Sequence, residues 1–460
     1  MTWRSRSLGL LAAALPSEAL AHASERGHVM LMPTSLYIVG GALAVLASMG
    51  LAAIAPSLTV GRWPVWDRIS LRAGQVTSAI PSLVSLALIL GLVSAGFWGP
   101  VDPISNPLPG TIWTLWWTGF TIAVIVLGNL WAALNPWTGL HDLAVGREGR
   151  PMFRLPARLG QWPAVLVFLC FAWFELIHPT PFDPARLATA VSAYLGFTFL
   201  GLFLFGRPWF TSVECFSVYF GMVSKLSPLQ WRREDGRLRL AIGIPGWALL
   251  RQTESGPGTT AFVLLALSTV SFDGFMRTFL WTGALGLNPL EFPGRSAVML
   301  PNSLGLLAMF CGLACLFWLA LRLGQWLSGE APAAAFVWSI VPIAFAYHVA
   351  HYLPEYPVSA MQALKALSDP FGTGLDIFGT AGLHPPASIM MDHRIATLVY
   401  RLQVAIIVAG HVLAVVIAHI MALRSASSAR SAIIGQIPLN LLMVFYTMFG
   451  LWLLSTPVIG

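Results

Sequence analysis

Long apolar stretches separated by short polar segments run along most of the chain. About ten of them are long enough, at roughly 20 residues, to cross the hydrocarbon core of a bilayer as helices. Pro and Gly gather between the stretches, as expected of loops that end helices. The pattern therefore predicts an all-α fold, a polytopic membrane bundle of about ten transmembrane helices. The stretches lie near residues 36–55, 80–97, 112–134, 164–177, 188–205, 260–272, 303–318, 336–352, 395–420 and 438–454.

The composition excludes other classes of protein. Hydrophobic residues make up 57% of the chain and charged residues 10%, against about 25% charged residues in a typical soluble domain. The 27 Phe and 19 Trp exclude a disordered chain. The net charge of +7 would suit a nucleic-acid partner, but no basic run is interleaved with aromatic residues on a polar face. We therefore expect a lipid bilayer and no nucleic acid as the partner.

The first 21 residues have the pattern of a secretory signal peptide. Arg4 and Arg6 precede the apolar run 8–15, which is too short to span a bilayer, and Ala19-Leu20-Ala21 is a small-x-small cleavage site. An uncleaved first helix is the alternative. Cleavage leaves residues 22–460 as a single transmembrane domain.

Basic residues indicate how the chain is oriented. Most of the 26 Lys and Arg residues lie in every second loop, and the positive-inside rule assigns those loops to the cytoplasm. Both ends of the mature chain then face the periplasm of a bacterial inner membrane. Segment 207–258 becomes a cytoplasmic loop and segment 354–395 an outer loop. The amphipathic stretch 211–226 is predicted to lie along the membrane or to re-enter it.

Carboxylates and imidazoles concentrate at the predicted outer ends of the spans. Glu175 and His178 end the fourth span, Asp273 ends the sixth, and His348 and His351 end the eighth. Ionisable groups at membrane depth are costly and usually functional. The sequence therefore predicts a site on the periplasmic side, with Asp273 or Glu175 as a general base or as a group that orients one.

His348 and His351 form the strongest local pattern. Residues at i and i+3 share a helical face, so the two imidazoles can ligate one metal ion. Interfacial histidines that only form hydrogen bonds are the alternative.

The Gly-rich loop 368–381 follows this span and contains Asp369 and Asp376. Glycines allow close backbone approach, so the two carboxylates are predicted as further metal ligands, with His178 or His393 as a fifth. Zn, Mn, Fe and Co all accept His and carboxylate ligands, which leaves the divalent ion open. A plain connector in which Asp serves as a turn residue is the alternative.

Several short segments, spread over most of the mature chain, form a recognisable combination. They are GFWGPVDP (96–103), NPW (135–137), ECFSVYFG (214–221), TVSFDG (269–274), AYHVAHY (346–352), SDPFGTGLDIFGTA (368–381) and QVAIIVAGHVLAVVIAH (403–419). The combination resembles bacterial membrane proteins called fenitrothion hydrolase. The resemblance implies a phosphoric triester hydrolase, similar to aryldialkylphosphatases, that releases a nitrophenol from an organophosphorus triester. It implies no residue roles.

The predicted site agrees with that chemistry. Hydrolysis of a neutral triester needs a hydroxide nucleophile, a Lewis acid and an apolar space for the aryl group. A metal ion in an outer cavity rich in Trp and Phe would supply all three. The expected substrate is small and lipophilic, and it would partition into the membrane.

Two other classes of function remain open. A transporter or channel for a small solute, proton or metal ion would use a relay of polar groups, although these cluster near the outer face. Its relay would comprise Glu175, Asp273, Arg401, Gln403 and His411. An envelope protein for assembly or metal delivery would bind copper through His22 and His28.

Overall fold

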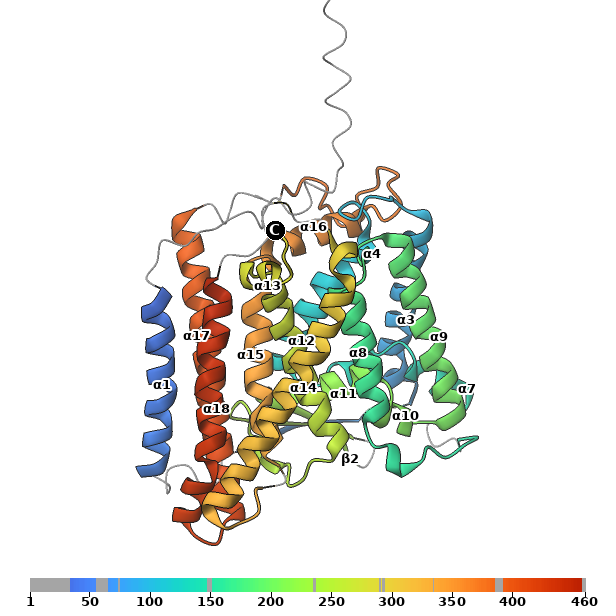
Figure 1. The fold of residues 1–460 in the computed structure, drawn as a ribbon. Helices are drawn as coiled ribbons and strands as arrows, with labels where there is room; N and C mark the ends of the chain where they lie inside the picture. Colours follow the sequence, from blue (N-terminus) through green and yellow to red (C-terminus); the bar gives the residue numbers. More distant parts are fainter. Residues whose placement is uncertain are drawn as a thin grey trace, which may run out of the picture.

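The computed structural model describes residues 34–54, 65–72, 75–146, 151–234, 237–288, 291, 294–333, 335–384 and 392–456. Over these residues the chain folds as an all-α helical bundle with one small sheet (Figure 1). The predicted signal peptide, residues 1–21, and the predicted copper ligands His22 and His28 lie outside the described residues.

Eight helices of the described part of the chain are long and apolar enough to cross a membrane. One of them, Pro107–Leu127, is composed of α4 (Pro107–Pro109), the π-helix η2 (Gly110–Phe120) and α5 (Thr121–Leu127). The polytopic helical bundle predicted from hydropathy is thereby confirmed. The other long helices are α1 (Thr34–Ile54), α3 (Gln75–Trp98), α9 (Pro184–Phe205), α12 (Pro257–Met276), α14 (Arg295–Ser328), α17 (His393–Ser425) and α18 (Ala429–Ser455).

Two of the predicted spans are irregular. The eighth consists of η7 (Phe336–Ser339) and α15 (Val341–Tyr352), and it bends by 71° into α16 (Tyr356–Ser368). The fourth is α8 (Trp162–Leu176), whose 15 residues extend about 22 Å, less than a hydrocarbon core of about 30 Å. Instead of about ten spans, the described residues give eight, or nine if the bent pair is one span.

Short elements connect the long helices. They are α6 (Trp131–Leu134), α7 (Thr138–Ala144), η3 (Ala157–Leu159), α10 (Pro208–Ser212), α11 (Cys215–Val223), η4 (Ser224–Leu226), η5 (Leu249–Arg251) and α13 (Phe279–Ala284). Helix α11 belongs to the stretch predicted to lie along the membrane or to re-enter it. Most of its side chains, Tyr219 and Phe220 among them, are buried, so it is enclosed by the bundle.

Three antiparallel strands form a sheet that the all-α prediction did not include. Strand β3 (Arg237–Gly243) lies between β1 (Val65–Arg72) and β2 (Leu229–Glu234). The sheet lies at the lower end of the bundle in Figure 1, and α16 lies at the upper end. We call these the sheet end and the α16 end.

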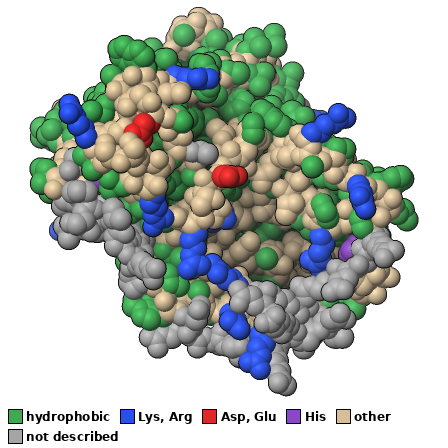
Figure 2. All heavy atoms as spheres, turned by 90° about the horizontal axis from the view of Figure 1, so that it is seen from below, with side chains coloured by type: hydrophobic (Ala, Val, Ile, Leu, Met, Phe, Trp, Pro, Cys, Tyr) green, Lys and Arg blue, Asp and Glu red, His purple; other side chains and the backbone are tan. Residues whose placement is uncertain are grey.

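The sheet end is basic. Figure 2 looks onto it and shows Lys and Arg side chains gathered there, with few acidic side chains in view. Arg232, Arg237 and Arg239 are exposed on the strands, and Arg251 is exposed beside them. The sheet end therefore carries the basic loops that the positive-inside rule assigns to the cytoplasm.

Aromatic side chains fill the middle of the bundle. The ring of Phe168 lies 5.0 Å from that of Phe262 and 5.6 Å from that of Tyr219, and Tyr219 lies 5.2 Å from Phe345. Helices α12 and α15 both run from the sheet end towards the α16 end (Figure 1). Phe262 and Phe345 therefore lie closer to the sheet end than Asp273 and the histidines that follow them on these helices.

Candidate functional site

Asp273 lies one turn before the C-terminus of α12 and is 1% exposed. Its Oδ1 accepts a hydrogen bond from Nε of Arg277 at 3.1 Å, an i,i+4 pair on the same helix. Its Oδ2 lies 2.7 Å from Nε2 of His351 on α15, which donates to the carboxylate. Two cationic or polar donors on two helices thus surround a carboxylate that would be costly to bury alone.

Tyr352 joins this carboxylate to Glu175. The hydroxyl of Tyr352 donates to Oε1 of Glu175 at 3.0 Å and lies 3.5 Å from Oδ2 of Asp273. Arg295 donates to the main-chain oxygen of Glu175 at 3.0 Å and so caps α8. The two predicted catalytic carboxylates therefore meet through one hydroxyl. We call Glu175, Asp273, Arg277, His351 and Tyr352 the Asp273 cluster.

His348 lies beside the cluster and has a different environment. It is 4% exposed, and its ring packs against Trp117 and Tyr352, each with a centroid distance of 5.0 Å. Its Nε2 atom has no hydrogen-bond partner. A buried polar atom without a partner is rare and calls for an explanation.

His348 also belongs to the wall of a small cavity. His348, Glu175 and Tyr352 line it together with an aromatic and aliphatic wall that includes Trp117 and Tyr219. Residues with an imidazole, a carboxylate and a hydroxyl therefore border one small space between α8, α12, α15 and η2. The cavity measures about 10 Å³, which is room for about one water molecule.

The two histidines predicted to share a metal ion differ in their contacts. His351 pairs with Asp273, whereas His348 faces the cavity. Among the described residues, no group of three or more His, Cys, Asp or Glu side chains is arranged to hold a metal ion. Metal binding therefore stays a prediction, and we assign no chemical step to a metal.

Asp369 and Asp376 form hydrogen bonds within their own loop. Asp369 accepts from the amides of Thr373 and Gly374, each at 2.8 Å. Despite some desolvation, which opposes the effect, these amides lower the pKa of Asp369. Asp376 accepts from the hydroxyl of Ser368 at 2.6 Å, and this bond lowers its pKa. These contacts fit the turn-residue alternative.

The two candidates for a fifth ligand lie apart from the cavity wall. Nδ1 of His178 accepts from the amide of Thr180 at 3.2 Å, and burial and Arg186 lower the pKa of His178. His393 is exposed as the first residue of α17. Neither histidine lines the cavity that contains His348.

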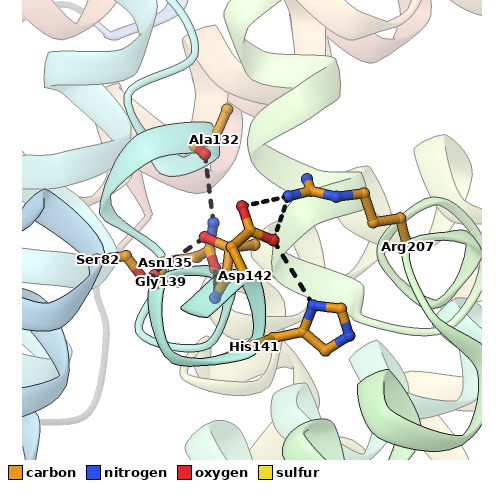
Figure 3. A network of polar contacts seen from close by, with 8 residues as sticks. Ser82, Ala132, Asn135, Gly139, His141, Asp142 and Arg207 are labelled. Atoms are coloured by element: carbon orange, nitrogen blue, oxygen red, sulfur yellow. Dashed lines mark hydrogen bonds and ion pairs between the residues drawn. The ribbon is translucent and has the colours of Figure 1, made fainter. Parts of the chain in front are cut away.

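A second polar network lies near the sheet end and is structural (Figure 3). Ser82 of α3 donates to the main-chain oxygen of Asn135 and accepts from the amide of Gly139. Arg207 contacts both carboxylate oxygens of Asp142 at 2.6 Å. The network ties α3, α7 and the start of α10 together, and Asn135 is the C-cap of α6.

Sequence reasoning missed three contributors to the site. Basic residues were interpreted only as signals of membrane topology, so Arg277 was missed, although its spacing from Asp273 is that of a helical ion pair. Trp117 and Tyr219 carried no signal of their own, because their roles depend on how η2 and α11 pack against α15.

No protein-family model, curated protein or solved structure matches the chain. The interpretation of the site consequently depends on its geometry and on its chemistry.

Proposed function

We propose that the chain is a membrane-embedded hydrolase of small lipophilic esters, among them organophosphorus triesters such as fenitrothion. One observation carries the proposal: Nε2 of His348 is buried without a hydrogen-bond partner. His348 shares a cavity wall with Glu175 and Tyr352. The cavity has room for about the attacking water alone, so the triester would have to part the aromatic wall to reach it. In this proposal the α16 end faces the periplasm.

The proposed reaction uses a water molecule as the nucleophile. Nε2 of His348 takes a proton from the water as its oxygen forms a bond to phosphorus, and the bond from phosphorus to the aryl oxygen breaks. The imidazolium then returns the proton to the departing nitrophenolate. Tyr352 donates its one hydroxyl proton to Glu175, so its oxygen is left at the cavity wall as an acceptor that can orient the attacking water.

A hydrolase panel on the detergent-purified chain tests this proposal. We expect turnover of nitrophenyl phosphotriesters, and we expect His348→Gln to lower kcat by about 10²–10⁴-fold, the usual contribution of a general base. His384→Gln, which replaces an exposed histidine of the outer loop, is the matched control and keeps full activity. A wild-type protein without esterase activity, or a fully active His348→Gln variant, would refute the proposal.

The same preparation tests the predicted metal ion. Stoichiometric Zn, Mn, Fe or Co, together with loss of activity on chelation, would establish the metal-assisted form of the reaction. A metal-free and chelator-resistant enzyme would leave His348 as the base without a Lewis acid.

A solute transporter is the second candidate, because interrupted helices surround the cavity. Helix α8 is short, α11 is buried, and α15 bends by 71° into α16. Broken helices around a central site are common in secondary transporters. Uptake of labelled small solutes into proteoliposomes, without ester hydrolysis, would favour this function over the hydrolase.

A further inference from the structure

Helices α17 and α18 bury a set of polar side chains that do not belong to the Asp273 cluster. His411 is 2% exposed, His419 1%, Gln436 3% and Asn440 9%. Nε2 of His411, Oε1 of Gln436 and Oδ1 of Asn440 have no hydrogen-bond partner. Buried polar atoms of this kind are costly within a membrane and indicate function.

The register of the two helices places these groups in a row. Nε2 of Gln436 donates to Nδ1 of His419 at 2.7 Å, and α17 and α18 join at the sheet end and run side by side (Figure 1). At 1.5 Å per residue, Asn440 lies about 6 Å and His411 about 12 Å beyond this pair towards the α16 end. Proton transfer across each of these steps needs a bridging water molecule.

The row continues towards the Asp273 cluster. The hydroxyl of Ser271 on α12 donates to the main-chain oxygen of Leu267, so the Tyr446 hydroxyl of α18 donates to Ser271 at 2.5 Å. Tyr446 faces the same helix as Tyr347, whose hydroxyl lies against Gly274, the residue after Asp273. Polar groups thus recur at intervals from the sheet end to the neighbourhood of the cluster, with hydrogen bonds between His419 and Gln436 and between Tyr446 and Ser271.

We propose that His419, Gln436, Asn440, His411, Tyr446 and Ser271 form a proton path from the sheet end to the Asp273 cluster. Nδ1 of His411 donates to the main-chain oxygen of Ile407 at 2.9 Å, which leaves Nε2 with a free lone pair. In the path, Nε2 of His411 accepts a proton and then releases it towards the Tyr446 hydroxyl. The transfer moves only protons, and no group is oxidised or reduced.

The path goes beyond the proposed hydrolase. Hydrolysis of a neutral triester produces an acid, and the path exchanges protons between the buried site and the opposite side of the membrane. Ester turnover and proton flux are measured independently. Turnover without flux would leave the hydrolase and remove the path, and flux without turnover would leave the path and remove the hydrolase.

Proton flux into liposomes tests the path. The full chain is reconstituted with an entrapped pH dye, and a potassium gradient with valinomycin drives protons across the membrane. We expect wild-type vesicles to change pH faster than protein-free vesicles. Tyr446→Phe, which leaves Ser271 bonded to Leu267, and His411→Leu should each lower the protein-dependent rate about tenfold.

Tyr400→Phe is the matched control for Tyr446→Phe. Tyr400 is also a buried tyrosine of the same helix pair, its hydroxyl has no partner, and it lies beyond the path towards the α16 end. It should keep the wild-type rate. Wild-type flux equal to that of protein-free vesicles, or equal flux in Tyr446→Phe, His411→Leu and the wild type, would overturn the path.

Discussion

At the scale of residues, charge compensation determines the candidate site. Asp273 is almost fully buried; its charge is balanced by Arg277 on the same helix, and it accepts a hydrogen bond from His351 on a neighbouring one. Removing one partner of a buried ion pair leaves an uncompensated charge, which costs more than removing both. Arg277 is 28% exposed, so solvent reduces this effect relative to a fully buried pair.

This difference predicts a double-mutant result. Asp273→Leu should lower the free energy of unfolding by about 2 kcal/mol, because Arg277 and His351 lose their anion. Adding Arg277→Met should recover part of that loss, since the stranded cation is removed with its partner. Thermal unfolding of the double variant and of the two single variants, Asp273→Leu and Arg277→Met, in detergent measures the coupling. Additive losses would show that the pair contributes no coupling energy.

The sequence could identify the members of the site but not their partners. Glu175, Asp273, His348 and His351 were predicted to share one end of the bundle, and the cavity and cluster bring them together there. Of the two histidines on α15, it is His351 that contacts Asp273. Which of them does so depends on how α12 is rotated against α15. No periodicity within one helix encodes that rotation.

At the scale of elements, hydropathy located the long helices and missed the sheet. The segments that became β2 and β3 were interpreted as one cytoplasmic loop, because their charges dominated the pattern. Asp235-Gly236 lies between them in sequence, and such a pair between two β-prone runs is a strong hairpin signal. The third strand, β1, could not be predicted locally, since it pairs with β3 across a long stretch of sequence.

Helix contacts through glycine make a prediction at this scale. A Cβ added to Gly324 of α14 would lie 2.0 Å from the main-chain oxygen of Gly435 on α18. Small residues permit such close approach of membrane helices, so Gly324→Ala should destabilise the chain by about 1–3 kcal/mol through overpacking.

The same helix offers the control. A Cβ at Gly312 would meet nothing within 4 Å, so Gly312→Ala should leave the unfolding temperature in detergent unchanged or raise it, because alanine favours helix. Equal unfolding temperatures for the two variants would contradict the close contact between α14 and α18.

At the scale of the whole molecule, the two ends differ in charge and in chemistry. Basic side chains gather at the sheet end (Figure 2), whereas the Asp273 cluster and the loop after α16 lie towards the opposite end. If the positive-inside rule holds for this chain, the sheet end faces the cytoplasm and the α16 end the periplasm. This orientation is the third prediction, and it decides from which side a substrate would reach the cavity.

Cysteine labelling measures the orientation directly. In a background without Cys170, Cys215, Cys311 and Cys315, one cysteine replaces Leu375 in the loop after α16, which is 54% exposed. Another replaces Met152, which is 74% exposed in the segment before α8. The neighbouring residue Pro151 packs against Gly206 at the end of α9. A membrane-impermeant maleimide should label Leu375→Cys in spheroplasts and Met152→Cys only in inside-out vesicles. The reverse pattern would place the cavity on the cytoplasmic side, and labelling of both positions from one side would contradict a membrane-spanning bundle, since these two loops lie at its opposite ends.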